Sequence, residues 1–172
     1  MPTPLHKIYQ FCPRCGARFA HHSPTLAKCE TCGLEHYINP KPVVNVLLIE
    51  PDNEIFLIKR GQDPMKGKWA LVGGFCDPNE TFEQTAVREA LEELNVKIEP
   101  DYLLGSVAKE SIYNDIMYPI LGVCVVAHIT DGQPKAGDDA EDFIKISPTK
   151  ALKTLPLIES TVFFLDTFTS AL

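Results

Sequence analysis

The sequence predicts an α+β fold, in which a mixed sheet packs against helices and follows a small cysteine-rich segment. Three observations support this fold class. Strand-like runs outnumber helical ones, and their connections range from tight turns to a longer polar loop. The clearest helical pattern lies at residues 80–94, in the middle of the chain. Four of the six cysteines fall within residues 1–38.

The cysteine-rich segment contains two pairs with the same spacing, Cys12-x2-Cys15 and Cys29-x2-Cys32, and a glycine follows each pair. Two such turns can aim four thiolates at one point, which is the ligand set of a structural zinc ion. Redox dithiols or disulfides are the alternative interpretation. A four-thiolate site has no open position, so we expect Zn²⁺ to act structurally and not in catalysis.

The remaining elements are predicted from periodicity and turn residues. Residues 39–42 contain two prolines and form a stiff connector. Ser147 followed by Pro148 indicates the start of a helix. The predicted strands are 43–49, 54–59, 69–72, 96–99, 102–109, 116–129 and 142–146, with a closing helix at 157–170.

Composition and charge limit the functions to consider. The chain has 172 residues with a net charge of −7, which disfavours capture of nucleic acid or anionic membrane by bulk charge. The first twenty residues have no apolar segment of the secretory type, and the uncharged run 116–130 is too short to span a membrane. We therefore expect a cytoplasmic protein whose thiols stay reduced.

The helix at 80–94 has recognisable ends. Thr81 and Gln84 match a capping box, and Asn95 occupies the position of a left-handed C-terminal residue. At 100° per residue, two faces separate. The predicted apolar face contains Ala86, Val87, Ala90, Leu91 and Leu94, and a second arc contains Glu89, Glu92 and Glu93.

The three glutamates of this arc repel one another, and Arg88 offsets only part of the repulsion. Hard oxygen ligands on one rigid face favour Mg²⁺ or Mn²⁺. The Gly73-Gly74 turn just before the helix allows a backbone carbonyl to approach the same ions. A solvated acidic face is the alternative, although it would not require this glycine turn at this spacing.

The segment from Gly74 to Val96 resembles the Nudix box. Gly74, five residues, Glu80, seven residues and then Arg88-Glu89-Ala90-Leu91-Glu92-Glu93 match its charged positions. Asn95 replaces the closing glycine, a mild change because asparagine tolerates the left-handed region. The resemblance implies an α/β/α sandwich over residues 39–172. Residues 1–38 resemble the zinc ribbon of the branch that includes the NADH pyrophosphatases.

The resemblance also implies an activity, namely metal-dependent hydrolysis of the pyrophosphate in a nucleoside diphosphate linked to another moiety. It implies that Glu89 and Glu93 are the principal Mg²⁺ or Mn²⁺ ligands, with Glu92 at a second ion and the Gly73 carbonyl completing a shell. Arg88 would orient a glutamate, and Glu80 would brace the loop. A late acid often serves as ligand or general base, and the candidate is Glu141 in the run Asp138-Asp139-Ala140-Glu141-Asp142.

The substrate stays open at this point. The downstream motif S-Q-P-W-P-F-P-x-S of the NADH pyrophosphatases has no match between residues 97 and 125. ADP-ribose, dinucleotide cofactors, nucleotide sugars and damaged nucleoside triphosphates remain, with ADP-containing diphosphates first. The partner is thus a small molecule, and we expect neither nucleic acid nor a membrane. A ribbon that packs or dimerises is compatible with a homodimer.

A different hypothesis is an adaptor that binds nucleic acid or protein through the zinc ribbon, with an idle Nudix domain. The distribution of charge disfavours it. Residues 77–93 carry a net charge of −5 and residues 138–142 carry −4, so the remaining 150 residues sum to only +2. The acidity is concentrated where a divalent-metal site is predicted, and no basic stripe is present.

Overall fold

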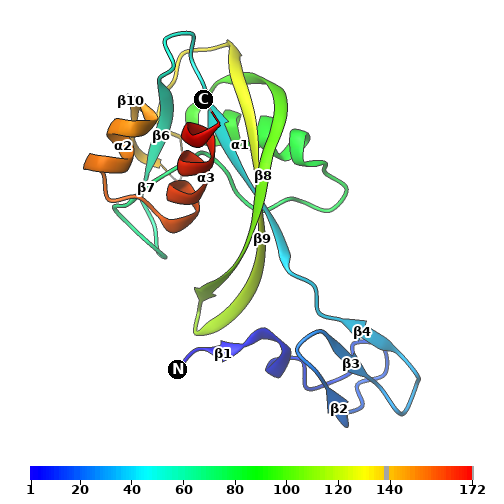
Figure 1. Cartoon of the computed structure of the whole chain (residues 1–172). Helices are drawn as coiled ribbons and strands as arrows, with labels where there is room; N and C mark the ends of the chain where they lie inside the picture. The colour runs from blue at the N-terminus through cyan, green and yellow to red at the C-terminus, as the bar shows by residue number, and fades with distance from the viewer. Residues whose placement is uncertain (138–139, 172) are drawn as a thin grey trace. The chain divides into compact units, whose positions relative to one another are not determined.

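The computed structural model describes residues 1–137 and 140–171, and of His21 and His22 it describes the backbone alone. The chain folds into two compact units, which are treated separately below (Figure 1). The first unit comprises Met1–Lys41 and Ala108–Ile120, and the second comprises Pro42–Val107 and Leu121–Leu172. The predicted domains, 1–38 and 39–172, stay a prediction.

The first unit is a small β structure. Its antiparallel sheet contains β2 (His21–His22), β3 (Leu26–Lys28) and β4 (Glu35–Tyr37). A short strand β1 (Thr3–Pro4) pairs in parallel with the start of β9 (Ile116–Asp131), and the 3-10 helix η1 (Leu5–Lys7) follows it. Its main buried cluster contains Cys12, Phe19, Ala27 and Cys29.

The second unit has two sets of strands. In one set, β9 pairs with both β5 (Lys41–Leu48) and β8 (Lys97–Tyr113). In the other, β6 (Ile55–Arg60) lies between β10 (Ala140–Ile146) and β7 (Trp69–Ala70). Antiparallel bridges between Val46 and Val72 and between Val43 and Phe75 connect β5 to the segment after β7. The β6–β10 pair is antiparallel and the Trp69–Leu157 bridge is parallel, as predicted for a mixed sheet.

Three helices cover the two faces of this sheet. Alternate side chains of β5 point to opposite sides, because a strand has a period of two residues. Val44, Val46 and Leu48 pack with α1 (Phe82–Leu94), whereas Leu47 packs with α2 (Pro148–Thr154) and α3 (Glu159–Ser170).

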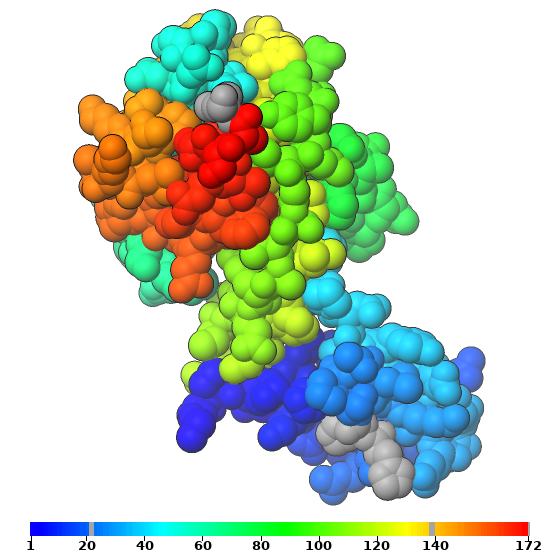
Figure 2. All heavy atoms as spheres, viewed as in Figure 1, coloured from blue at the N-terminus to red at the C-terminus, as the bar shows by residue number. Residues whose placement is uncertain are grey.

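Figure 2 shows α2 and α3, in orange and red, together on one surface of the second unit. The predicted α/β/α sandwich is confirmed. Among the described residues, no helix is both long and apolar enough to cross a membrane.

One pair of predicted strands differs from the structure, whereas the predicted helix start at Ser147 is confirmed. The predicted strands 96–99 and 102–109 are not separate, because residues 97–113 form the single strand β8, which runs through Pro100. Proline is tolerated there because the described part of the sheet pairs β8 with β9 alone, and proline lacks the N–H that a second neighbour would require. Ser147 precedes Pro148 at the start of α2, but its side chain makes no capping hydrogen bond.

The predicted ends of α1 are confirmed. The Thr81 hydroxyl accepts a hydrogen bond from the Gln84 amide at 3.2 Å, and the Gln84 side-chain oxygen accepts one from the Thr81 amide at 2.9 Å. At the other end, Asn95 has φ 55° and ψ 38°, the left-handed conformation that glycine usually supplies. The substitution of asparagine for the closing glycine of the box therefore leaves the helix end intact.

Candidate active site

The Gly73-Gly74 turn places two glutamates of α1 against backbone. The Gly73 amide donates a hydrogen bond to Glu93 Oε2 at 2.8 Å. A β-carbon at Gly73, where φ is 149°, would overlap the Val44 carbonyl oxygen, and one at Gly74 would overlap the Glu89 carboxylate. Gly74 thus leaves the space that the Glu89 carboxylate occupies, and Gly73 lets the turn approach the Val44 backbone.

The predicted apolar face of α1 is partly wrong. Val87 and Leu91 are exposed, at 39% and 51%, whereas Glu89 and Glu93 are buried, at 8% and 9%. Ala86, Ala90 and Leu94 do face the core. The reason is that this face of α1 lies against the Gly73-Gly74 turn. The turn has no side chains for apolar residues to pack against, and the carboxylates of Glu89 and Glu93 lie against it instead.

One guanidinium joins three carboxylates. Arg88 donates to both oxygens of Glu80, at 2.9 and 3.0 Å, to Glu89 at 2.7 Å and to Glu92 at 3.0 Å. It also donates to the Phe75 carbonyl at 2.9 Å. The carboxylates in turn raise the pKa of Arg88, so that the guanidinium stays charged. Arg88 therefore fixes both the loop and the helix glutamates.

Glu80 connects the loop to the helix. Its carboxylate accepts the Asp77 amide at 3.1 Å and the Thr85 hydroxyl at 2.9 Å, in addition to the Arg88 bonds. Hydrogen bonding from Arg88, followed by that from Asp77, lowers the pKa of Glu80 to about 2. Sequence reasoning missed the role of Thr85. Its only signal in the sequence is that a β-branched polar residue lies in the helix, and the structure shows that this residue is buried.

The electrostatics of this cluster suit a divalent cation. Glu80, Glu89, Glu92 and Glu93 together with Arg88 carry three net negative charges. Burial raises the pKa of Glu89, and the neighbouring Arg88 opposes that effect. A buried carboxylate that lacks sufficient positive charge gains from a metal ion. Carboxylate oxygens are the donors that Mg²⁺ and Mn²⁺ prefer, so the donor chemistry of these side chains suits such an ion.

Glu141 lies in a different environment from the helix carboxylates. It is the second residue of β10, and its exposed carboxylate forms an ion pair with Lys59 Nζ at 3.2 Å. The structure does not join Glu141 to the Arg88 cluster through any described hydrogen bond. Lys59 was missed by sequence reasoning, because no local pattern connects residues so far apart in the chain. Asp138 and Asp139 lie outside the described residues.

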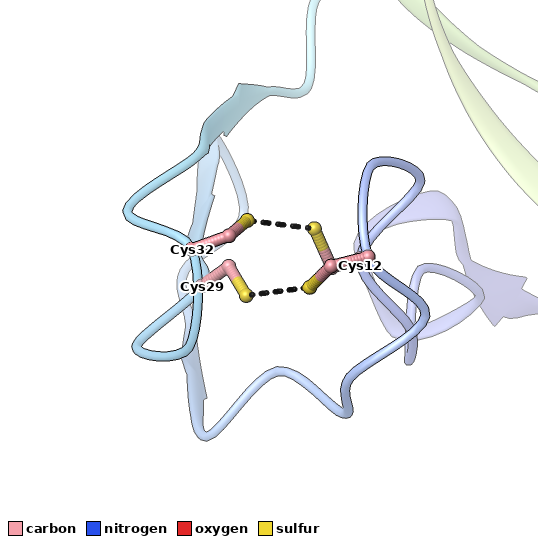
Figure 3. Close-up of side chains that lie close together, drawn as sticks. Cys12, Cys29 and Cys32 are labelled. Carbon is pink, nitrogen blue, oxygen red and sulfur yellow. Dashed lines mark hydrogen bonds between the residues drawn. The ribbon is translucent and has the colours of Figure 1, made fainter.

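The four cysteines of the first unit converge. Their sulfur atoms all lie within 4.8 Å of one another (Figure 3), and the Cys12–Cys32 and Cys15–Cys29 Sγ–Sγ distances are 3.6 Å. Tetrahedral zinc with bonds of about 2.3 Å requires sulfurs roughly 3.8 Å apart, whereas a disulfide requires about 2.05 Å. All four cysteines are free, and their geometry fits zinc.

The two cysteine turns have the same backbone geometry. The Gly16 amide donates to the Cys12 carbonyl at 2.9 Å, and the Gly33 amide donates to the Cys29 carbonyl at 2.8 Å. Both glycines have φ 74°, which explains why glycine follows each pair. The repeat seen in the sequence is therefore a repeat of structure.

Comparison with known proteins identifies the family. The sequence model of the NUDIX domain matches residues 39–162, which include the whole of α1 and its glycine turn. The chain belongs to the Nudix family. The match covers well over half of the chain, so the family assignment extends beyond the box that first indicated it.

Two curated relatives illustrate the range of this family. An ADP-ribose pyrophosphatase of Methanocaldococcus jannaschii is 37% identical over 106 residues, which is 62% of this chain and 61% of that protein. An NAD-capped RNA hydrolase, NudC of Vibrio cholerae, is 29% identical over 103 residues, 59% of this chain and 38% of that protein. The chain thus spans less than two thirds of the length of either relative.

Solved structures agree on the fold. A NUDIX hydrolase from Nitrosomonas europaea has a TM-score of 0.70 and 26% identity, with 94% of this chain and 93% of that chain covered. The NUDIX domain of Shewanella oneidensis NrtR, solved with ADP ribose, has a TM-score of 0.62 and 22% identity. This match covers 77% of this chain and 88% of that chain, and it supports the fold alone.

Proposed function

We propose that this protein hydrolyses the pyrophosphate bond of an ADP-containing diphosphate, releasing AMP and a phosphorylated remainder. The observation that carries the proposal is the Arg88 cluster, in which three net negative charges meet at a turn without side chains. Relatives named as an ADP-ribose pyrophosphatase and an NAD-capped RNA hydrolase support the substrate class. ADP-ribose and NAD-type dinucleotides are therefore the first candidates.

The proposed roles follow the burial of each side chain. Glu89 and Glu93 are the principal ligands for Mg²⁺ or Mn²⁺, with the more exposed Glu92 at a second ion and the Gly73 carbonyl completing a shell. Such ions neutralise phosphate charge and lower the pKa of a bound water. Arg88 orients Glu89 and Glu92, and Glu141 is the general base outside the box.

The first unit is proposed to bind structural zinc through Cys12, Cys15, Cys29 and Cys32. Its small core gives a physical reason for the metal, because a segment of this size buries little apolar surface by itself. Residues 1–38 then form the zinc ribbon domain and residues 39–172 the hydrolase domain.

A substitution at Glu93 tests the proposed activity. We expect Glu93→Gln to lower kcat at least about a hundredfold with Mg²⁺ and ADP-ribose, because it removes a buried charged ligand while keeping the shape of the side chain. The matched control is Glu83→Gln, an exposed glutamate on the first turn of the same helix.

The assay should compare ADP-ribose, NAD, NADH, NAD-capped RNA and a nucleotide sugar by kcat/KM. Wild-type turnover in the Glu93→Gln variant would exclude the proposed site. Tight, salt-sensitive binding of RNA without any turnover would instead support the adaptor hypothesis.

A further inference from the structure

The segment after β7 pairs with β5 and extends the sheet as far as the proposed metal site. The residues of this ladder share one antiparallel register, in which the pairs are Val46 with Val72, Val44 with Gly74 and Val43 with Phe75. No bulge interrupts the register, so Asn45 lies opposite Gly73. Successive side chains of a strand alternate between the two faces of a sheet. Val72 packs with α1, and Asn45 and Phe75 therefore lie on the opposite face.

Phe75 carries an exposed aromatic ring on this face. The residue is 56% exposed and belongs to neither hydrophobic cluster of the second unit. Its backbone is fixed, because the Arg88 guanidinium donates to the Phe75 carbonyl at 2.9 Å. A residue bonded to the glutamate cluster thus has a ring with no packing role. Single exposed aromatic residues are common in proteins, so its neighbour on the same face is needed to assign a ligand.

That neighbour is Asn45, a buried amide with an unused acceptor. Asn45 is 7% exposed, and its Nδ2 donates to the Val123 carbonyl at 3.4 Å. Among the described residues, none donates a hydrogen bond to its Oδ1. Gly73 lies opposite on one neighbouring strand, and on the other a β-carbon at Gly122 would lie 3.6 Å from Nδ2. Neither glycine has a side chain that could supply the donor, and buried amides normally have one.

Gly73 connects this face to the proposed metal site. Its amide donates to Glu93 Oε2 at 2.8 Å, and its carbonyl is the proposed backbone ligand. Asn45 lies directly across the ladder from Gly73, and Phe75 lies two residues further along the same segment. A nucleotide whose pyrophosphate lies at the metal ions can therefore place its base on the face of Asn45 and Phe75.

We propose that Asn45 and Phe75 form the subsite for the adenine of the substrate. The Phe75 ring stacks on the base, and Asn45 Oδ1 accepts a hydrogen bond from the exocyclic amino group, which asparagine commonly recognises in adenine. Both contacts are uncharged, which suits a nucleobase and not a phosphate. The inference rests on the proposed function and extends it from the reacting bond to the choice of base.

The first test compares ADP-ribose with its hypoxanthine analogue, IDP-ribose, on the wild-type protein with saturating Mg²⁺. The reacting bond is the same, but a carbonyl replaces the amino group of the base. We expect kcat/KM to be at least about tenfold lower for the analogue, because Asn45 Oδ1 would then face a second acceptor. Equal kcat/KM for the two substrates would overturn the Asn45 contact, and this comparison requires no variant.

Asn45→Leu identifies the residue responsible for that preference. Leucine has a similar size and no acceptor, so we expect this variant to use ADP-ribose and IDP-ribose with similar kcat/KM. A preference for ADP-ribose that remains in Asn45→Leu would overturn the assignment, because another group would then read the amino group.

The stacking contact is tested with Phe75→Ala, Phe75→Tyr and Phe163→Ala. Phe163 is the matched control, since it is a 42% exposed phenylalanine on α3. We expect Phe75→Ala to raise KM for ADP-ribose about tenfold with little change in kcat, the size of effect that loss of one stacked base produces. Phe75→Tyr and Phe163→Ala should match the wild type. An unchanged KM in Phe75→Ala, or an equal rise in Phe163→Ala, would overturn the contact.

Binding of AMP, measured by isothermal titration calorimetry with Mg²⁺, separates this proposal from the proposed function because it requires no turnover. We expect the Kd of AMP to rise about tenfold in Phe75→Ala and to stay unchanged in Phe163→Ala. If AMP binds Phe75→Ala as it binds the wild type while Glu93→Gln is inactive, the adenine subsite is wrong but the hydrolase stands. If Glu93→Gln is fully active, the proposed function itself fails, and the AMP result still decides the subsite.

Discussion

Two adjacent glycines decide where the glutamates of α1 can lie. Gly73 lets its amide reach Glu93, and Gly74 leaves open the volume that the Glu89 carboxylate fills. The sequence predicted the turn and its approach to the proposed metal site. It could not show that Gly74, because it has no side chain, leaves room for the buried Glu89 carboxylate.

At this scale, Gly74→Ala is predicted to damage the site without unfolding the protein. The new methyl group would displace the Glu89 carboxylate, and a misplacement of about 1 Å can cost roughly a hundredfold in rate. We expect kcat and Mn²⁺ affinity to fall together, measured by steady-state kinetics and metal titration. Gly105→Ala is the control, because nothing lies within 4 Å of its added β-carbon. Similar losses in both variants would contradict this explanation.

At the scale of the element, the loop before α1 and the helix behave as one piece. Glu80 accepts hydrogen bonds from the loop amide of Asp77 and from Thr85 and Arg88 on the helix. The capping box and the left-handed Asn95 then define where the helix begins and ends. These features are short-range in sequence, which is why local patterns predicted them correctly.

The burial of the helix was harder to predict. Periodicity alone placed Val87 and Leu91 on the buried face, but the structure buries Glu89 and Glu93. Periodicity reports which side chains share a direction and not what lies opposite them. The segment opposite this face of α1 is the glycine turn. Its Gly73 amide donates a hydrogen bond to Glu93, and Gly74 leaves room for the Glu89 carboxylate.

The Glu80 brace predicts a specific dependence of stability on pH. Arg88 and the Asp77 amide lower the pKa of Glu80 from 4.5 to about 2 in the folded state. Its contribution is therefore complete above pH 4.5 and is lost as the pH falls toward 2. We expect urea midpoints of the wild type and Glu80→Gln to differ at pH 6 and to converge toward pH 2. A difference that stays constant with pH would contradict the ionic role of Glu80.

At the scale of the whole molecule, the two units depend on different sources of stability. The second unit has two hydrophobic clusters, one on each face of its sheet, formed entirely by its own residues. The first unit has a small core that includes two of the four cysteines. It also carries a net charge of +2 against −9 for the second unit, so the acidity of the chain belongs to the second unit.

Removal of the proposed zinc ion should therefore unfold the first unit selectively. Structural zinc contributes about 10 kcal/mol or more to the folding of small domains at pH 7. After treatment with a zinc chelator and return of Mg²⁺, we expect amide hydrogen exchange to rise across residues 1–41, while α1 stays protected. Cys12→Ser should have the same effect without a chelator. Loss of protection in α1 together with residues 1–41 would contradict independent stability.

The sequence by itself determined the cysteine repeat and the ends of α1, and its resemblance to the Nudix box implied the sandwich fold and the glutamates proposed as metal ligands. The first two depend on spacings within one turn or one helix, where backbone geometry leaves few alternatives. Only the tertiary structure decided which face of α1 is buried, how the Gly73 amide meets Glu93 and which cation faces Glu141. Those contacts join different strands and helices, and their partners are selected by packing, which no local pattern records.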